Sequence, residues 1–279
     1  MGRYSHSKIS TFEQCKYKYK LAYIDMIRSD VQSIESFMGS LVHQTLEKLY
    51  KDVVHGKITD KEDLLRFYLL TWSREWNKDI LIAKKEFDAE YYQNLGLTFI
   101  LEYYDTYFPF DTLETIGIET DERLKLSNNN EYYVRIDRLA KDDAGNYYVI
   151  DYKTSNGLKK QEELDKDRQL AMYSLWVKEK YLDAKSVKLV WNFLAFNEEK
   201  TSVRSDEELV RLREEVEKVI QKIEVCTDFP TTVSKLCNYC EYKAICPAWK
   251  ESTPGDKTKY HKQTSLHKFI DEPPIFSKH

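Results

Sequence analysis

The sequence lacks any long uninterrupted apolar run. No stretch approaches the roughly 18 apolar residues that a transmembrane helix requires. The first residues, MGRYSHSKIS, contain no apolar segment of the secretory type. We therefore expect a cytoplasmic protein that does not enter a membrane.

Two further absences narrow the function. The chain has no G-x-x-x-x-G-K-S/T stretch, so it cannot be a helicase motor by itself. It also has no excess of positive charge, since 43 Lys and Arg residues oppose 47 Asp and Glu residues and the net charge is −4. A global basic field typical of nucleic-acid-binding proteins is missing. Local basic patches or bound metal ions can still supply positive charge.

Cysteine is scarce and odd in number. An odd count in a reducing compartment argues against a disulfide framework and indicates metal ligation, with one thiol left over. We expect that thiol to be Cys226, as a buried apolar side chain. The five cysteines are Cys15, Cys226, Cys237, Cys240 and Cys246.

The patterns that are present predict a helical first half and a mixed second half. The 279 residues, 42% of them hydrophobic, can bury one large core or two small ones. Helices are expected at about 10–24, 35–54, 60–78 and 85–106, and Pro109 ends this half. Strands are expected at 115–126, 132–139, 146–154 and 187–196, with helices at 160–181 and 206–224. This order favours an α/β (α+β) fold with a mixed sheet and an added helical subdomain.

The segment VIDYKT at 149–154 places two charges in a predicted buried strand. Asp151 and Lys153 share one face, because strand side chains alternate. Asp137 and Asp151 are equally distant from position 144, inside the predicted turn at 141–146, so a symmetric hairpin sets them opposite each other at about 4.5–5.5 Å. A divalent cation would neutralise the two acids. The alternative is a surface hairpin with solvated charges.

Two helical pairs add to this pattern. Gly39 and His43 lie one helical turn apart, so that glycine lets another segment approach a candidate metal ligand. Gln169 and Tyr173 share one face of the helix predicted at 160–181 and could bind the lysine or a DNA phosphate. Structural roles remain open for both pairs.

Six segments, in order, resemble the RecB-like branch of the PD-(D/E)XK nuclease superfamily. The similarity is greatest to the iron–sulfur exonucleases of CRISPR adaptation and to the nuclease domain of AddB. The segments are SKISTFEQCKYKYKLAYI at 7–24, GSLVHQTLE at 39–47, RIDRL at 135–139, VIDYKT at 149–154, RQLAMY at 168–173 and CNYCEYKAIC at 237–246. The resemblance implies a restriction-endonuclease-like mixed β-sheet core flanked by helices at 111–225. Around it we expect a helical region at 1–110, an iron–sulfur region at 226–252 and a flexible tail at 253–279.

The resemblance also implies a role for each matching residue. Metal ligands for Mg²⁺ or Mn²⁺ would be His43, Asp137, Asp151 and the Tyr152 carbonyl, with Glu119 as a further acidic candidate. Lys153 corresponds to the catalytic lysine, assisted by Gln169 and Tyr173 of the family's QxxxY motif. The implied reaction is metal-assisted hydrolysis of a phosphodiester bond.

The cysteine pattern predicts a metal site that ties the two ends of the chain together. Cys237 and Cys240 form a C-x2-C pair, Cys246 follows, and Cys15 lies far away in the sequence. Four such thiolates fit a 4Fe–4S cluster, although zinc sites also use C-x2-C pairs. The family resemblance favours the iron–sulfur cluster.

Two segments are candidates for partner binding. The first predicted helix interleaves cations with aromatics, which suits single-stranded DNA, although a solvated helix face would look the same; the DNA-binding candidates are Lys8, Lys16, Tyr17 and Lys20. In the tail, Gln263, Leu266 and Phe269 resemble a sliding-clamp-binding peptide.

The resulting hypothesis is a metal-dependent DNA exonuclease that acts on single-stranded DNA or duplex ends. The resemblance implies 5′→3′ polarity, a role in DNA repair or CRISPR adaptation, and a helicase or CRISPR integrase as partner. A structure-specific endonuclease is the alternative enzyme. An iron–sulfur DNA-binding subunit of a nuclease–helicase complex is the alternative without activity.

Overall fold

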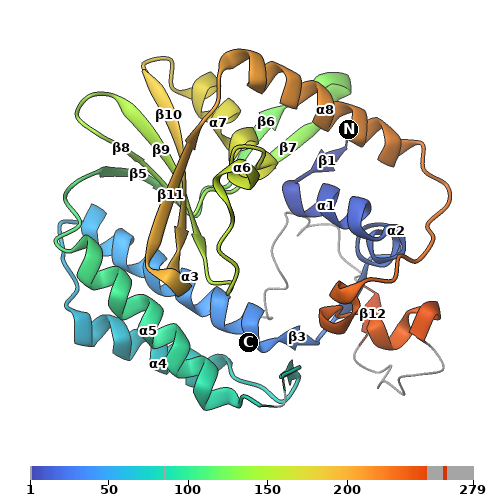
Figure 1. The fold of residues 1–279 in the computed structure, drawn as a ribbon, viewed down its shortest axis with the longest axis horizontal. Helices are drawn as coiled ribbons and strands as arrows, with labels where there is room; N and C mark the ends of the chain where they lie inside the picture. Colours follow the sequence, from blue (N-terminus) through green and yellow to red (C-terminus); the bar gives the residue numbers. More distant parts are fainter. Residues whose placement is uncertain (1, 85, 250–259, 263–279) are drawn as a thin grey trace.

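The computed structural model describes residues 2–84, 86–249 and 260–262 (Figure 1). Most of the predicted tail, including the clamp-peptide residues Gln263, Leu266 and Phe269, lies outside the described residues. Within the tail, β12 (Tyr260–Lys262) pairs antiparallel with β2 (Ile27–Ser29). None of the described helices is long and apolar enough to cross a membrane.

A five-stranded mixed sheet forms the centre of the molecule. Its order is β11-β10-β9-β8-β5, with β9 and β10 parallel and the other neighbours antiparallel. The predicted mixed sheet is therefore confirmed, while its polar edge strand β11 was not predicted. The strands are β5 (Glu114–Ile118), β8 (Arg138–Lys141), β9 (Asn146–Lys153), β10 (Ser186–Phe193) and β11 (Glu198–Val203).

Helices cover both faces of this sheet, as Figure 1 shows. Ile150 and Tyr152 pack against the helices of the first half, and Val149 packs toward α7 (Arg168–Lys180) and α8 (Asp206–Glu224). The alternation of β9 side chains thus separates two hydrophobic cores. The first-half helices are α3 (Ile34–Val54), α4 (Lys61–Glu75) and α5 (Ala89–Tyr107), each begun by a side-chain cap from Ser33, Asp60 or Asp88.

Two predicted strands are wrong as continuous elements. The segment 115–126 divides into β5 and β6 (Glu122–Lys125), and 132–139 divides into β7 (Glu131–Val134) and β8. Strands β6 and β7 join β1 (Arg3–Tyr4) in a second sheet. The bend occurs at Glu119, which has a positive φ of 45°, and the Glu119 N–H still donates to the Asp137 carbonyl at 3.0 Å. Both chain segments therefore turn together from one sheet into the other.

Two predicted helices are also interrupted. The segment 160–181 divides into α6 (Gln161–Leu164) and α7. The first helix begins earlier than predicted, because Ser5 rather than Ser10 caps α1 (His6–Gln14). It stops at Cys15, whose backbone is extended (φ −157°, ψ 108°), and continues as α2 (Lys16–Tyr19) and a π-helical turn (Lys20–Ile24).

The remaining elements are short. Strands β3 (Gln32–Ser33) and β4 (Ile80–Leu81) pair in parallel. Short 3-10 helices span Ser127–Asn129, Leu194–Phe196, Lys235–Tyr239, Lys243–Ile245 and Pro247–Trp249. Figure 1 places the last three beside α2, so the C-terminal turns lie against an N-terminal segment of the chain.

Candidate active site

The β8–β9 hairpin has the register that the sequence predicted. Arg138 pairs with Ile150 and Leu139 with Val149, which sets Asp137 across from Asp151 one step beyond the ladder. The Asp137 and Asp151 side chains are 13% and 10% exposed, so both acids are largely withdrawn from water. Asp137 Oδ2 accepts a hydrogen bond of 2.8 Å from the Tyr152 N–H, which fixes this carboxylate at the end of β9.

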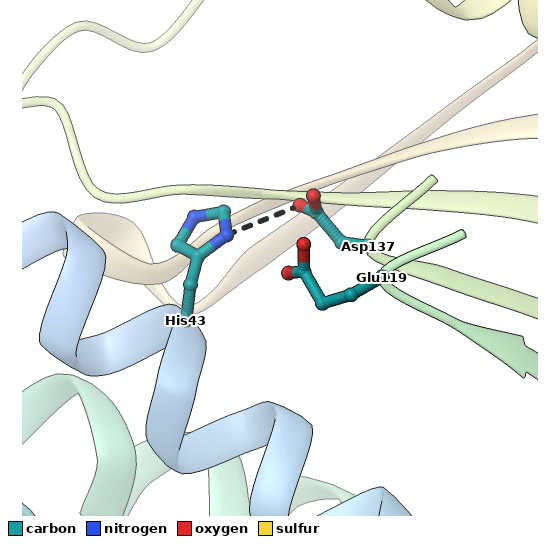
Figure 2. Close-up of side chains that lie close together, drawn as sticks. All are labelled: His43, Glu119 and Asp137. Carbon is teal, nitrogen blue, oxygen red and sulfur yellow. Dashed lines mark ion pairs between the residues drawn. The ribbon is translucent and has the colours of Figure 1, made fainter. Parts of the chain in front are cut away.

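His43 joins Asp137 and Glu119 in one group (Figure 2). The three residues offer ligand atoms that all lie within 4.8 Å of one another. His43 Nε2 lies 2.9 Å from the Tyr152 carbonyl, which can only accept, so this ring nitrogen carries the proton. His43 Nδ1 faces Asp137 Oδ2 at 3.4 Å. The predicted ligand carbonyl of Tyr152 is thus occupied as an acceptor, and it orients the histidine.

Lys153 and Asp151 form the second half of the site. Lys153 Nζ lies 2.6 Å from Asp151 Oδ2 and donates to Gln169 Oε1 at 3.4 Å. Gln169 Nε2 in turn lies 3.4 Å from the Tyr173 hydroxyl. The glutamine and tyrosine predicted to share a helix face therefore extend from α7 toward the lysine.

Burial and mutual repulsion set the charges of the site. Burial, followed by the charges of Asp151 and Glu119, raises the pKa of Asp137 to about 7 against the attraction of His43. Burial lowers the pKa of the Lys153 amine, but the Asp151 carboxylate outweighs this and the pKa is raised overall. Lys153 is therefore an ammonium group at neutral pH, suited to donating hydrogen bonds rather than to removing a proton.

The donor set fits a divalent metal ion. Two carboxylates and an imidazole suit Mn²⁺, and carboxylates suit Mg²⁺. Burial is the largest cause of the raised pKa of Asp137, and the charges of Asp151 and Glu119 add to it, so the ionised form of Asp137 is disfavoured. A cation held by His43, Glu119 and Asp137 would stabilise the ionised carboxylate.

Gly39 permits the close approach of α3 to the end of β9. A Cβ atom at this position would lie 2.8 Å from Thr154 Oγ1. Gly39→Ala gains about 1 kcal/mol of helix propensity but adds an overlap beside Lys153. We expect the change in unfolding free energy caused by Gly39→Ala to be about 1 kcal/mol more favourable in a Thr154→Ala background, where the opposing oxygen is absent. Urea unfolding of the wild type, both single variants and the double variant measures this coupling; additive free energies would contradict it.

Four cysteines line one cavity that opens to solvent. Cys15 reaches it from the break between α1 and α2, and Cys237, Cys240 and Cys246 reach it from the C-terminal 3-10 turns. Burial and the neighbouring Glu241 raise the pKa of Cys240 to about 11, and burial raises the pKa of Cys246. Cys226 is not among the lining residues; its sulfur lies 3.1 Å from the Asp228 carbonyl.

The predicted DNA-binding residues lie beside this cavity and on α1. Lys8 Nζ donates to the Arg3 carbonyl at 2.7 Å, and Lys16 Nζ lies over the Phe12 ring at 5.3 Å. Lys20 pairs with Asp25 at 2.5 Å, while Tyr17 lines the cavity.

One site residue escaped sequence reasoning. Arg135 lies at the bend between β7 and β8, and its Nε donates to Glu119 Oε2 at 2.8 Å. Its place two residues before Asp137 was the available signal. The predicted strand 132–139 instead treated it as an ordinary strand residue.

Of the comparisons with known proteins, the family model assigns this chain to a family. A family model described as the PD-(D/E)XK nuclease superfamily matches residues 3–247. No curated protein matches. A solved structure named "Crystal structure of SSO0001" aligns at 17% identity with a TM-score of 0.35, covering 87% of this chain and 95% of that one. Since the family model spans most of the chain and includes His43, Glu119, Asp137, Asp151 and Lys153, this protein belongs to the PD-(D/E)XK nuclease superfamily.

Proposed function

We propose that the protein is a metal-dependent exonuclease that degrades single-stranded DNA with 5′→3′ polarity. One observation carries the nuclease assignment. The β8–β9 hairpin places Asp137, which belongs to the group His43, Glu119 and Asp137, across from Asp151, which pairs with Lys153. Strand polarity and the preference for DNA ends rest on the resemblance to iron–sulfur exonucleases. Since the chain has no nucleotide-binding loop, a partner helicase or an existing single strand supplies the substrate.

Each side chain has a separate task in this proposal. His43, Glu119, Asp137 and Asp151 hold the metal ion, which when bound supplies an activated water and stabilises phosphate charge. The Tyr152 carbonyl holds the His43 ring so that Nδ1 faces the metal position. Lys153 presents an ammonium group to the phosphate oxygen that gains charge. Gln169 limits the positions that the lysine can adopt.

End-labelled oligonucleotides test the activity. With Mn²⁺ or Mg²⁺, a 5′-labelled single strand should release labelled product at once, whereas a 3′-labelled strand should shorten progressively. A covalently closed single-stranded circle should remain intact. Cleavage of the circle would instead indicate an endonuclease. DNA binding without cleavage under either metal would leave only a binding subunit.

We further propose that the four cavity cysteines hold a structural 4Fe–4S cluster. A zinc ion bound at about 2.3 Å by four thiolates requires sulfurs about 3.8 Å apart. Among the residues described, the ligand atoms of His43, Glu119 and Asp137 lie within 4.8 Å of one another, whereas no three cysteine sulfurs lie that close together. A cluster that bonds each thiolate to a different iron suits this wider spacing better.

Cys15→Ser should therefore remove the cluster, while Cys226→Ser should keep it. Both changes replace sulfur by oxygen, but Cys15 lines the cavity and Cys226 does not. Protein purified without oxygen should contain about four iron atoms per chain in the wild type and in the Cys226 variant. Iron and zinc analysis together with visible absorption measures this. Stoichiometric zinc in the wild type would refute the iron–sulfur assignment.

A further inference from the structure

Arg135 is a half-exposed arginine at the edge of the metal group, with most of its hydrogen-bonding capacity unused. Its side chain is 34% exposed, whereas that of its partner Glu119 is 16% exposed. Only the Nε–H is engaged, at 2.8 Å from Glu119 Oε2. Among the described residues, no side chain or carbonyl accepts from its two terminal amino groups. Arg135 therefore keeps both terminal amino groups available as donors.

The other arginines near the active site differ in this respect. Arg168 uses both terminal nitrogens on Glu13. Arg138 is buried on the opposite face of the sheet, where it stacks on Tyr50 and donates to Thr115 Oγ1 and the Leu113 carbonyl. Arg123 donates through NH1 to Asp121 Oδ1 at 2.6 Å and stacks on Tyr133. Arg135 alone among these four combines an open fork with contact to the group His43, Glu119 and Asp137.

The charge of Arg135 suits a phosphate better than it suits the metal group. Glu119 belongs to the candidate ligands, so a cation bound there and the Arg135 guanidinium share one carboxylate. A guanidinium that keeps Nε on that carboxylate still has its two terminal nitrogens in the planar fork that matches phosphate oxygens. A scissile phosphate that reached a cation held by this group would lie within reach of such a fork.

On this basis, and resting on the proposed nuclease function, we propose that Arg135 binds a non-bridging oxygen of the scissile phosphate through its terminal nitrogens. Glu119 orients the guanidinium and thereby couples the phosphate contact to the metal group. The alternative is that Arg135 only balances the charge of Glu119. The two roles predict different DNA affinities when Arg135 loses its charge.

The test compares Arg135→Gln with the matched variant Arg123→Gln, a nearby arginine paired with an acid outside the site. DNA affinity is measured on a single-stranded oligonucleotide in Ca²⁺, under conditions where no cleavage is detected. Arg135→Gln should bind about 10-fold more weakly, as expected for one charge-assisted contact. Its plot of log affinity against log salt should flatten by about 0.7. Arg123→Gln should change neither quantity.

The affinity for Mn²⁺ should change in the direction opposite to the affinity for DNA. Because Arg135 competes for Glu119, Arg135→Gln should bind Mn²⁺ more tightly in the absence of DNA, by calorimetric titration. At saturating Mn²⁺ its kcat/KM should still be about 10-fold lower than that of the wild type. Arg135→Lys, which keeps the charge but not the fork, should recover only part of this loss.

Unchanged DNA affinity and unchanged salt dependence in Arg135→Gln would overturn the phosphate contact. So would an activity loss that saturating Mn²⁺ fully restores, because that result means charge balance alone. The binding measurements do not need cleavage. If the wild-type protein cuts no DNA, the nuclease function is refuted. The binding measurements would still show whether Arg135 contacts DNA.

Discussion

Asp137→Asn is expected to abolish cleavage and, without metal, to make the protein more stable than the wild type at pH 8. The loss of activity should reach about 1000-fold or more, because the variant removes a carboxylate from the group proposed to hold the metal. The gain in stability follows from the environment of Asp137. Burial and the neighbouring acids raise its pKa to about 7, from an ordinary value of 3.8.

The pH dependence follows from the direction of this shift. Between about pH 4 and pH 7 the unfolded chain has released the Asp137 proton and the folded chain still holds it, so stability falls as pH rises. Above pH 7 the full penalty applies, on the order of 4 kcal/mol, since one pKa unit is worth about 1.4 kcal/mol. Asparagine escapes this penalty, and its side-chain oxygen still accepts from the Tyr152 N–H.

Asp142→Asn is the matched control on the same hairpin. Hydrogen bonds from Asn146 and Tyr148 lower the pKa of Asp142 from 3.8 to about 2. The ionised carboxylate of Asp142 therefore stabilises the folded state at pH values above 3.8, and this contribution is lost as the pH falls toward 2. Asp142→Asn should therefore lower the melting temperature at pH 8 and leave cleavage intact. Thermal unfolding from pH 5 to pH 8, with and without Mn²⁺, measures both variants. Mn²⁺ should raise the melting temperature of the wild type and have little effect on Asp137→Asn. If Asp137→Asn melts below the wild type at pH 8, the buried acids are not in conflict.

The sequence predicted the central hairpin of the site because its geometry is local. The turn at 141–146 fixes the register, and the alternation along β9 then decides which side chains share a face. Asp137, Asp151 and Lys153 follow from these two facts. The helix α8 was also predicted with its observed bounds, since Ser205 and Glu208 form a capping box and the apolar positions repeat at helical spacing.

The bend that completes the site was not predictable in this way. A strand of alternating residues gives no sign that it will leave one sheet and enter another, because both sheets require the same alternation. The bend depends on a positive φ at Glu119, and glutamate, unlike glycine or asparagine, seldom adopts a positive φ. Glu119 and Arg135 enter the site only through this bend, so their pairing had to come from the tertiary structure.

Lys153→Met is expected to show the opposite combination, with lower stability without metal and lower activity under all conditions. Asp151 is 10% exposed and has Lys153 Nζ at 2.6 Å, so the variant leaves a largely buried carboxylate without its cation. Removing one partner of a buried pair destabilises by about 3–5 kcal/mol, and the 26% exposure of the lysine side chain reduces this to roughly 1–3 kcal/mol here. The turnover number should fall about 100- to 1000-fold, because the proposed donor to the charged phosphate oxygen is lost.

Mn²⁺ separates the two roles of this lysine. A metal ion near Asp151 replaces the missing positive charge, so Mn²⁺ should restore most of the stability of Lys153→Met without restoring cleavage. Lys188→Met is the matched control, because Lys188 is also half-buried on a central strand and, within the described part of the chain, donates only to the Tyr148 hydroxyl. It should retain full activity. If saturating Mn²⁺ returned Lys153→Met to wild-type turnover, Lys153 would serve only to balance Asp151, and the stabilisation of the phosphate would have to come from Arg135 and the metal ion.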